Sequence, residues 1–302
     1  MRKPLLSHLP HLSLLFLLST LCASPALAQG LPFKWEELTA ADFLKALDAS
    51  QRTCAIPLGI IEKHGPSGPL GTDLLNVRYI TTLAAHQEYV LVFPEYFVGQ
   101  IFEARHQPGT IAYSSRLQFD VLQETVSEMA RNGCKKIILI NGHGGNNSLL
   151  PYFAQSQLDS PKDYIVYVVS SDAVPPDSMP AAARPSKPGV DGGHAGEDEI
   201  SNIVASRPDL AHPERGNSES GADLDRLKLP AGVYTGIWWY AKFPNHYAGD
   251  ASGATAARGQ AITQVLARHL AQTIRAIKAD TVGPRLQQEF FERAAKPTVP
   301  RP

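Results

Sequence analysis

The residues most able to do chemistry in this 302-residue chain lie in short, glycine-rich stretches. The stretch IEKHGPSGPLGTD contains Glu62, His64 and Asp73, and the later stretch NGHGGN contains His143. Imidazole and carboxylate groups without thiolates are ligands typical of Zn²⁺, Mn²⁺ or Fe²⁺ at catalytic sites. Each stretch taken alone is also compatible with a polar surface loop or a tight turn, so their joint placement is decisive.

A third polar stretch, GGHAGEDE, contains His194 and three consecutive acids that open an amphipathic helix. Helical periodicity turns Asp198 outward and places Glu197 and Glu199 on opposite sides of the apolar face. Acids at a helix start also interact favourably with the helix dipole, so this run is not by itself evidence of a site. Periodicity does not separate Glu197 from Glu199 as a ligand.

Glu62, His64, Asp73, His143 and one Glu of residues 197–199 together supply two imidazoles and three carboxylates as candidate ligands. A carboxylate that bridges two ions would leave each ion with three protein ligands and an open position for water. Two such ions lower the pKa of a bridging water and polarise the carbonyl that it attacks. The expected chemistry is metal-assisted hydrolysis. A Walker-type phosphate loop is excluded, because no Gly-Lys-Ser/Thr follows NGHGGN.

Short apolar runs alternate with helical patterns along the chain, which predicts an α/β fold. Strands are expected at Cys54–Ile61, Tyr89–Phe93, Lys136–Ile140 and Tyr164–Val169. Helices are expected at Thr39–Leu47, Leu74–Gln87, Ser115–Arg131 and about Ala254–Ala279. Nearly continuous hydrophobicity is typical of strands buried on both faces of a sheet. The expected architecture is a three-layer α/β/α sandwich with a mostly parallel central sheet.

Two of the expected strands run directly into the polar stretches. Glu62 and His64 follow the first strand, and His143 follows the third. In open parallel sheets, ligands bind beyond the carboxyl ends of the strands. We therefore expect these side chains to converge at one edge of the sheet.

Residues 1–28 have the features of a cleaved secretory leader. Arg2 and Lys3 precede the short apolar run Leu12–Leu21, and the small-x-small sequence ALA ends the segment. The expected organisation is a leader at residues 1–28, one domain at residues 29–293 and a disordered tail at residues 294–302. The protein is therefore expected to be exported, to the periplasm or the medium, with a membrane anchor as the alternative.

Charge and cysteine content limit the partners and the compartment. Arg2 and Lys3 leave with the leader, so 26 of the 28 basic residues remain against 29 acidic residues. This balance gives no electrostatic reason to expect binding to nucleic acid or to an anionic membrane. Cys22 also leaves. Cys54 and Cys134 then form either a disulfide, which an oxidising compartment permits, or two buried thiols.

The polar stretches, taken in order, carry a resemblance to a known family. GIIEKHGPSGPLGTD, HQPGTI, NGHGGN, HAGEDEIS and YAGDASGATAARG resemble the motifs of the creatininase (creatinine amidohydrolase) family, over essentially the whole mature chain. The resemblance implies a two-metal amide hydrolase with an α/β/α core, often assembled into oligomers such as hexamers. Its cofactors would be two divalent ions, Zn, Mn or Fe.

The resemblance also implies which residues bind the ions. Glu62, Asp73 and His143 would hold one ion. His64, Asp73 and Glu199 would hold the other, so that Asp73 bridges the pair.

Two further residues are expected to act in catalysis, His194 and Glu197. By the resemblance, His194 sits over the site as a proton-transfer residue or a substrate ligand. Family members that open creatinine have a Glu two places after the NGH histidine, a place that Gly145 takes here. The second-metal acid must then come from elsewhere. The motif favours Glu199, with Glu197 as the second choice.

Several departures from the family pattern concern the substrate. Lys63 replaces a Gln between two ligands and is expected to point away from the metals. Ser67 and Gly68 replace a His-Leu pair, and Ile200 replaces a Thr, a change expected to be structural. Residues 171–196 contain no aromatic residue, whereas the creatinine-processing branch has Trp there. Creatinine is therefore not the expected substrate.

Two weaker features remain open. His106, just before a Pro-Gly-Thr sequence, either lines the pocket or has no ligand role. The aromatic patch formed by Trp238–Tyr240, His246 and Tyr247 favours core packing or a subunit interface, with a substrate wall as the alternative.

The leading hypothesis is an exported amidohydrolase that acts on the C–N bond of a small amide, cyclic amides included. The expected partners are the substrate and other copies of the chain, with no nucleic acid and no membrane after leader removal. One alternative is a non-catalytic binding member of the same fold. Another is a metal-dependent lactone or formamide hydrolase.

Overall fold

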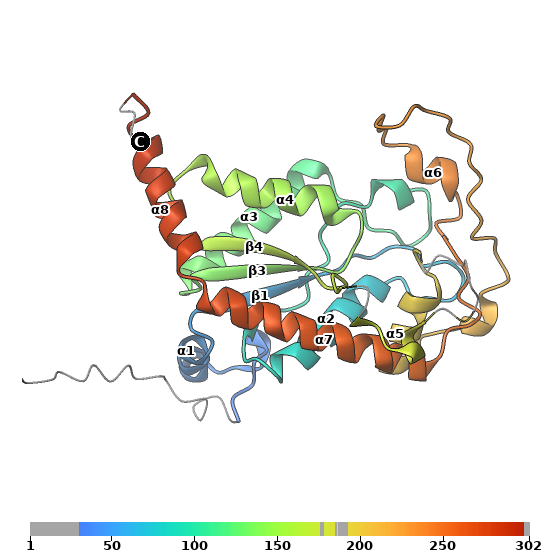
Figure 1. Cartoon of the computed structure of the whole chain (residues 1–302), viewed down its shortest axis with the longest axis horizontal. Coiled ribbons are helices and arrows are strands. Elements are labelled where there is room, and N and C mark those ends of the chain that lie inside the picture. Colours follow the sequence, from blue (N-terminus) through green and yellow to red (C-terminus); the bar gives the residue numbers. More distant parts are fainter. Residues whose placement is uncertain (1–29, 176–177, 185, 187–192, 299–302) are drawn as a thin grey trace, which may run out of the picture.

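The computed structural model describes residues 30–175, 178–184, 186 and 193–298 (Figure 1). The leader expected at residues 1–28 lies outside these ranges, as does the end of the expected tail at residues 299–302. Within the described ranges, no helix combines the length and the apolar character needed to cross a bilayer.

Four parallel strands form the central sheet (Figure 1). The strands are β1 (Thr53–Leu58), β2 (Leu91–Val92), β3 (Lys136–Asn141) and β4 (Ile165–Ser170). Their order in the sheet is β2-β1-β3-β4, so each connection crosses over the sheet through a helical segment.

Helices cover both faces of this sheet. The α-helices are α1 (Ala40–Ala49), α2 (Thr72–Ala85), α3 (Ser115–Arg131), α4 (Asn146–Ser156), α5 (Glu197–Ser206), α6 (Trp238–Lys242), α7 (Ala256–Ala279) and α8 (Val282–Ala294). Single 3₁₀ turns lie at Trp35–Glu37, Phe102–Ala104, Gln157–Asp159, Ala181–Ala183 and Pro213–Arg215. The predicted three-layer α/β/α sandwich with a parallel sheet is confirmed.

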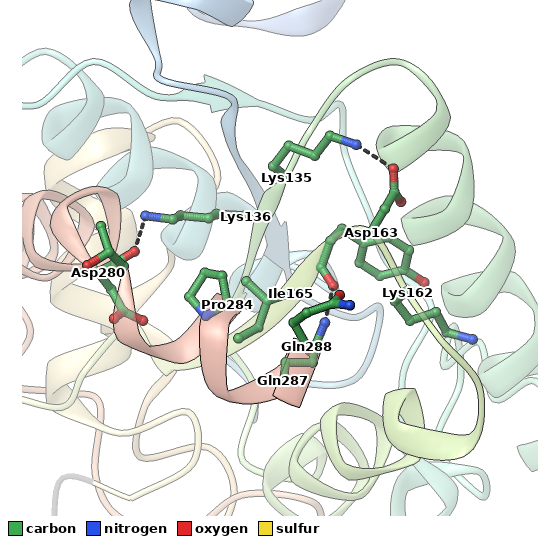
Figure 2. A pocket seen from close by; sticks show the side chains of 11 residues that line it. Lys135, Lys136, Lys162, Asp163, Ile165, Asp280, Pro284, Gln287 and Gln288 are labelled. Atoms are coloured by element: carbon green, nitrogen blue, oxygen red, sulfur yellow. Dashed lines mark hydrogen bonds and ion pairs between the residues drawn. The ribbon is translucent and has the colours of Figure 1, made fainter. Parts of the chain in front are cut away.

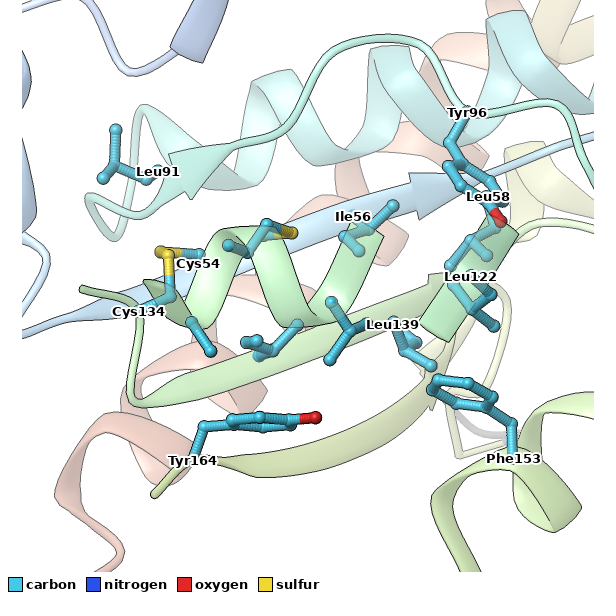
Figure 3. Close-up of a cluster of buried hydrophobic side chains, with 14 of the residues drawn as sticks. Cys54, Ile56, Leu58, Leu91, Tyr96, Leu122, Cys134, Leu139, Phe153 and Tyr164 are labelled. Atoms are coloured by element: carbon cyan, nitrogen blue, oxygen red, sulfur yellow. A yellow bond between two sulfur atoms is a disulfide. The ribbon is translucent and has the colours of Figure 1, made fainter. Parts of the chain in front are cut away.

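Alternate strand residues face two separate cores. Ile56 of β1 and Leu139 of β3 pack in a cluster with side chains of α3 and α4 (Figure 3). Ala55 and Ile138 face the other way and pack with side chains of α2 and α7. Because helices cover both faces, the middle residues of β1 and β3 are apolar on both sides, as expected for a parallel sheet.

The helix starts follow local signals in the sequence. The hydroxyl of Thr39 accepts a hydrogen bond from the backbone N–H of Asp42 at 3.2 Å and caps α1. Ser114 caps α3, whose bounds are those predicted, and Thr255 caps α7. These starts depend on neighbouring residues, so they can be predicted without knowledge of tertiary contacts.

The ends of the strands depend on packing and differ from expectation. β1 ends at Leu58 rather than Ile61. Gly59 passes so close to the start of α2 that a Cβ there would lie 2.3 Å from the backbone N of Leu74. The chain therefore leaves the sheet here. Helix α8 was not predicted, and of its residues only Phe291 is buried.

A disulfide joins the start of β1 to the loop before β3 (Figure 3). Cys54 and Cys134 are fully buried, and their Cα atoms are 5.9 Å apart. The bridge spans 80 residues of sequence. Of the two states that the sequence left open, the structure has the disulfide.

A long segment with little regular structure projects beyond the carboxyl ends of the strands (Figure 1). We call residues 217–247, which include α6, the outer segment. Its two arms contact each other: the N–H of Leu224 donates to the carbonyl of Lys242 at 3.0 Å, and the Lys242 ammonium donates to Asp223 at 2.9 Å.

Candidate metal centre

The polar stretches leave the sheet at the same edge. β1 and β3 pair in register, with Leu58 opposite Asn141 at their last residues. Glu62 and His64 follow β1, and His143 follows β3. These carboxyl ends point toward α5 and the outer segment (Figure 1). The structure thus brings together side chains that are more than 70 residues apart in sequence.

The first group of candidate ligands is Glu62, Asp73 and His143, all buried. His143 Nδ1 lies 2.9 Å from Glu62 Oε1 and 2.8 Å from Asp73 Oδ2. The ring donates its Nε2–H to the carbonyl of Gln100 at 2.9 Å, so in the neutral ring Nδ1 carries a lone pair.

The electron-rich atoms of this first group lack hydrogen-bond donors. Glu62 Oε1 and Asp73 Oδ2 are buried and have no hydrogen-bond partner among the described residues. When the His143 ring is neutral, two carboxylate oxygens and an imidazole lone pair therefore face one another. Buried charges are normally paired or bound to a metal. A divalent cation at this position would satisfy all three atoms.

The second group is His64, Asp73 and Glu199. His64 Nε2 lies 2.9 Å from Asp73 Oδ1 and 3.8 Å from Glu199 Oε2. The other ring nitrogen, Nδ1, donates to the backbone carbonyl of Glu62 at 3.2 Å, which leaves Nε2 to face the carboxylates. Asp73 thus turns one oxygen toward each group, as a bridging ligand requires.

Asp73 and Glu199 are each positioned by the first turn of a helix. Asp73 lies in the first turn of α2 and is 3% exposed. Glu199 lies in the first turn of α5, where its Oε2 accepts the backbone N–H of Ala195 at 2.6 Å. Ala195 has a φ of 60°, in the left-handed region, and this conformation directs its N–H to Glu199.

Burial and mutual attraction set the ionisation of the cluster. Burial opposes a charged His64, but neighbouring Asp73 raises the pKa of His64 to about 9. Burial likewise opposes a charged His143, whose pKa Glu62 and Asp73 raise well above its ordinary value. Burial raises the pKa of Glu199 to about 7. Protons and metal cations therefore compete for the same positions.

His194 lies over the second group, as the resemblance implies. Its ring centroid is 4.4 Å from that of His64 and 4.4 Å from that of His246. Its Nε2–H donates to the backbone carbonyl of Lys63 at 2.9 Å. Burial lowers the pKa of His194 to about 3, so the ring is neutral near pH 7.

The structure does not bring Glu197 to this cluster, which differs from the catalytic position expected for it. Its carboxylate accepts the backbone N–H and the hydroxyl of Ser186, at 3.0 Å and 2.8 Å to Oε2. Its Oε1 lies 3.5 Å from Nε of Arg258, a buried guanidinium that also pairs with Asp198. These partners hold Glu197 elsewhere, so Glu199 alone of the two acids reaches the candidate ligands.

His246 contacts the ligand cluster, although its sequence context favoured core packing or a subunit interface over a substrate wall. His246 is 2% exposed, and its Nε2 is hydrogen-bonded to Glu62 Oε2. Trp239 of α6 donates its indole N–H to His246 Nδ1 at 2.9 Å. The only signal in the sequence was the density of aromatic residues around Trp239, which favoured core packing or an interface.

His106, a weaker candidate, and Lys63, expected to point away from the metals, contact the outer segment and not the cluster. His106 Nε2 is hydrogen-bonded to the carbonyl of Pro244 at 2.8 Å, and its ring packs edge-on against Tyr240. Lys63 points to Glu219, with Nζ 2.6 Å from Oε2. Both contacts attach the outer segment to the rim of the site.

A cavity of about 430 Å³ lies at the opposite edge of the sheet, where β3 and β4 begin (Figure 2). Its charged groups are already paired. Lys135 pairs with Asp163, and the Lys136 ammonium donates to three backbone carbonyls at the end of α7. This cavity lacks the clustered imidazoles and carboxylates of the carboxyl edge.

Comparison with known sequences agrees with the resemblance that the motifs carry. A sequence profile of the creatininase family, described as creatinine amidohydrolase, matches residues 36–274. The creatinine amidohydrolase of Pseudomonas putida is 25% identical over 193 residues, which cover 59% of this chain and 74% of that protein. The mycofactocin precursor peptide peptidase of Mycobacterium tuberculosis is 28% identical over 226 residues, which cover 72% of this chain and 82% of that one.

Solved structures share the fold. A mutant creatininase of the Zn-Zn type superposes with a TM-score of 0.66 at 22% identity, covering 82% of this chain and 99% of that chain. A manganese form of creatininase gives a TM-score of 0.65 at 22% identity, with the same coverage.

Proposed function

Because the chain belongs to the creatininase family, a family of metal-dependent amidohydrolases, we propose that it hydrolyses a C–N bond of a small amide at a two-metal centre. The observation that supports this most strongly is the bridging arrangement of Asp73. One of its oxygens lies 2.8 Å from His143 Nδ1 and the other 2.9 Å from His64 Nε2. A cation at each of these two positions would bind the ring nitrogen and the carboxylate oxygen together.

The proposed ligands divide into two sets that share Asp73. Glu62, Asp73 and His143 would hold the first ion, and His64, Asp73 and Glu199 the second. Zn²⁺, Mn²⁺ and Fe²⁺ suit this mixture of nitrogen and oxygen ligands. When bound, the two ions supply a hydroxide near neutral pH and polarise the carbonyl under attack.

Residues of the chain orient the ligand imidazoles and transfer the proton. His64 and His143 each commit one ring N–H to a backbone carbonyl, which fixes the orientation of the other nitrogen. His194 donates its Nε2–H to the backbone carbonyl of Lys63, so Nδ1 is the atom that can accept a proton and return it to the leaving nitrogen.

The substrate is proposed to differ from creatinine. Gly145 takes the place of the Glu found in creatinine-opening members, and the fold leaves no room for a side chain there. A Cβ at Gly145 would lie 2.4 Å from His143 Nε2 and 2.6 Å from the carbonyl oxygen of Gln100. The segment around Gln100 therefore fills the space that an acid would need, and the substrate must be bound by other groups.

We also propose that the protein is exported and self-associates. The leader-like sequence of residues 1–28 and the buried Cys54–Cys134 disulfide both support an oxidising destination, periplasmic or secreted. The outer segment exposes Tyr234 by 77% and Ile237 by 53%, which supports an interface with another copy.

Substitution of Asp73 tests the proposed function. The purified protein should contain two transition-metal ions, lose amide hydrolysis on chelation and regain it with Zn²⁺, Mn²⁺ or Fe²⁺. Asp73→Ala should lower kcat/KM by roughly 10³-fold or more, equivalent to about 4 kcal/mol, and should lose both ions. The control is Asp120→Ala, which removes an exposed carboxylate of α3.

The substrate panel should contain small linear and cyclic amides, with lactones and formamides as the competing classes. An Asp73→Ala protein with two ions and full turnover would refute the proposal. A wild-type protein that binds no stoichiometric metal would instead support a non-catalytic binding member of the fold.

A further inference from the structure

His246 occupies an unusual position for a residue far from the other site residues in sequence. It is separated from Glu62 by 184 positions and sits at the end of the outer segment. Its φ of 52° is in the left-handed region, which costs a non-glycine residue free energy. Its carbonyl accepts the backbone N–H of Gly65, the residue after His64, at 3.4 Å. In this backbone conformation the ring reaches Glu62.

The hydrogen bonds of His246 define which nitrogen carries the proton. An indole N–H can only donate, so the bond from Trp239 at 2.9 Å requires a lone pair on His246 Nδ1. In the neutral ring the proton is then on Nε2. Nε2 faces Glu62 Oε2, so His246 donates to that oxygen. Trp239 therefore fixes the tautomer in which His246 is a donor to Glu62.

This contact divides the two oxygens of Glu62 between two tasks. Oε2 is occupied by the N–H of His246, whereas Oε1 faces His143 Nδ1 at 2.9 Å and has no donor among the described residues. A carboxylate held at one oxygen cannot rotate freely about its last bond. It therefore presents a single, defined oxygen toward the first ion position.

We propose that His246, with its tautomer fixed by Trp239, is the positioning residue for Glu62, so that the outer segment completes the first metal site. The inference rests on the proposed function, in that Glu62 must bind a metal. Mutation of a partner that orients a metal ligand in this way typically lowers metal affinity by about 10- to 100-fold.

The arrangement makes metal binding depend on how the outer segment is seated. Besides Trp239, this segment is attached to the rim through Pro244, whose carbonyl accepts from the side-chain amide of Gln107 at 2.9 Å. The Lys63–Glu219 ion pair holds its other arm. Displacement of the segment would remove the His246 donor from Glu62 while leaving the second ion's ligands in place.

The test measures the affinity of each site for Zn²⁺ and Mn²⁺ by competition with a chromophoric chelator, in the full chain and without reference to activity. His246→Phe keeps a ring but removes both nitrogens, and should weaken the first ion by about 10- to 100-fold. The second ion should retain its affinity. His246→Gln supplies an amide N–H that can donate to Glu62, so it should recover part of the loss.

Trp239→Phe isolates the role of the indole N–H. It should weaken the first ion by a smaller factor than His246→Phe, and this effect should disappear when both substitutions are combined. The matched control is Trp238→Phe, which alters a neighbouring Trp that is 38% exposed. Thermal unfolding of the metal-free proteins reports whether each variant is folded.

Two outcomes separate the inference from the function on which it rests. If wild type binds two ions and folded His246→Phe and Trp239→Phe bind the first equally tightly, the positioning role is refuted while the metal centre stands. If wild type binds no metal and Asp73→Ala is indistinguishable from it, the proposed function fails, and the inference with it.

Discussion

The two edges of the sheet differ in how their polar groups are hydrogen-bonded. At the amino edge, where the strands begin, the Lys136 ammonium donates to the carbonyls of Ile277, Lys278 and Asp280 at 2.6–2.9 Å. At the carboxyl edge, Glu62 Oε1 and Asp73 Oδ2 are buried beside the His143 ring and have no hydrogen-bond partner in the part of the chain that the structure describes. One edge is closed by its own hydrogen bonds, and the other is incomplete.

This difference distinguishes a scaffold from a site. An unsatisfied buried carboxylate destabilises a fold, so it persists only where a ligand supplies the missing partner. The amino edge even contains the cavity of Figure 2, but the charges around it are paired within the chain. Buried carboxylate oxygens without hydrogen-bond partners, rather than the presence of a cavity, identify the candidate active site.

Removal of the disulfide should have the largest effect on stability and none on the metal centre. The bridge between Cys54 and Cys134 lies at the amino edge, and replacing both residues by Ala should lower the free energy of unfolding by about 2–4 kcal/mol. Denaturant unfolding of oxidised wild type and the double variant measures this difference. Equal stabilities, or a changed metal affinity in the folded variant, would contradict the separation of the two edges.

A second prediction concerns the pH dependence of metal binding at the carboxyl edge. With a pKa of about 9, His64 carries a proton at neutral pH that a metal ion must displace. Affinity should therefore rise with pH, by roughly tenfold per unit for each proton displaced, and the His64 contribution should level off as pH approaches 9. Below about pH 7 the Glu199 proton should steepen the rise.

Competition with a chelator of known pH dependence, at pH 6, 7 and 8, measures this slope. Glu199→Gln should reduce the slope below pH 7, because it removes one of the competing protons. A metal affinity that is constant over this range would mean that the imidazoles are not ligands.

Local chemistry explains how much of this molecule could be predicted from sequence. Thr39 and Ser114 cap helices through contacts three residues away, so α1 and α3 were placed closely. The convergence of His64 and His143 followed from the rule for carboxyl ends of parallel strands. The early end of β1 could not be predicted, because it depends on the approach of Gly59 to α2.

The parts of the site that were missed depend on distant partners. Helical periodicity could not separate Glu197 from Glu199, since the difference arises from Arg258 and Ser186 on one side and Ala195 on the other. His246 lies 184 positions from Glu62, at the end of the outer segment, which has little regular structure. No spacing rule relates such residues, so only the folded chain shows that they meet.

The smallest expected effect is that of a substitution at the amino edge, which tests whether the hydrogen bonds there stabilise the fold independently of the metal centre. Lys136→Met removes a cation from the carboxyl-terminal end of α7, where the helix dipole and three carbonyls favour positive charge. The free energy of unfolding should fall by about 1 kcal/mol, with metal affinity unchanged. Lys135→Met is the matched control, because its ammonium pairs with the exposed Asp163 and should contribute less than about 0.5 kcal/mol. If Lys136→Met instead weakened metal binding, the two edges would be coupled through β3, and the contrast between scaffold and site would not hold.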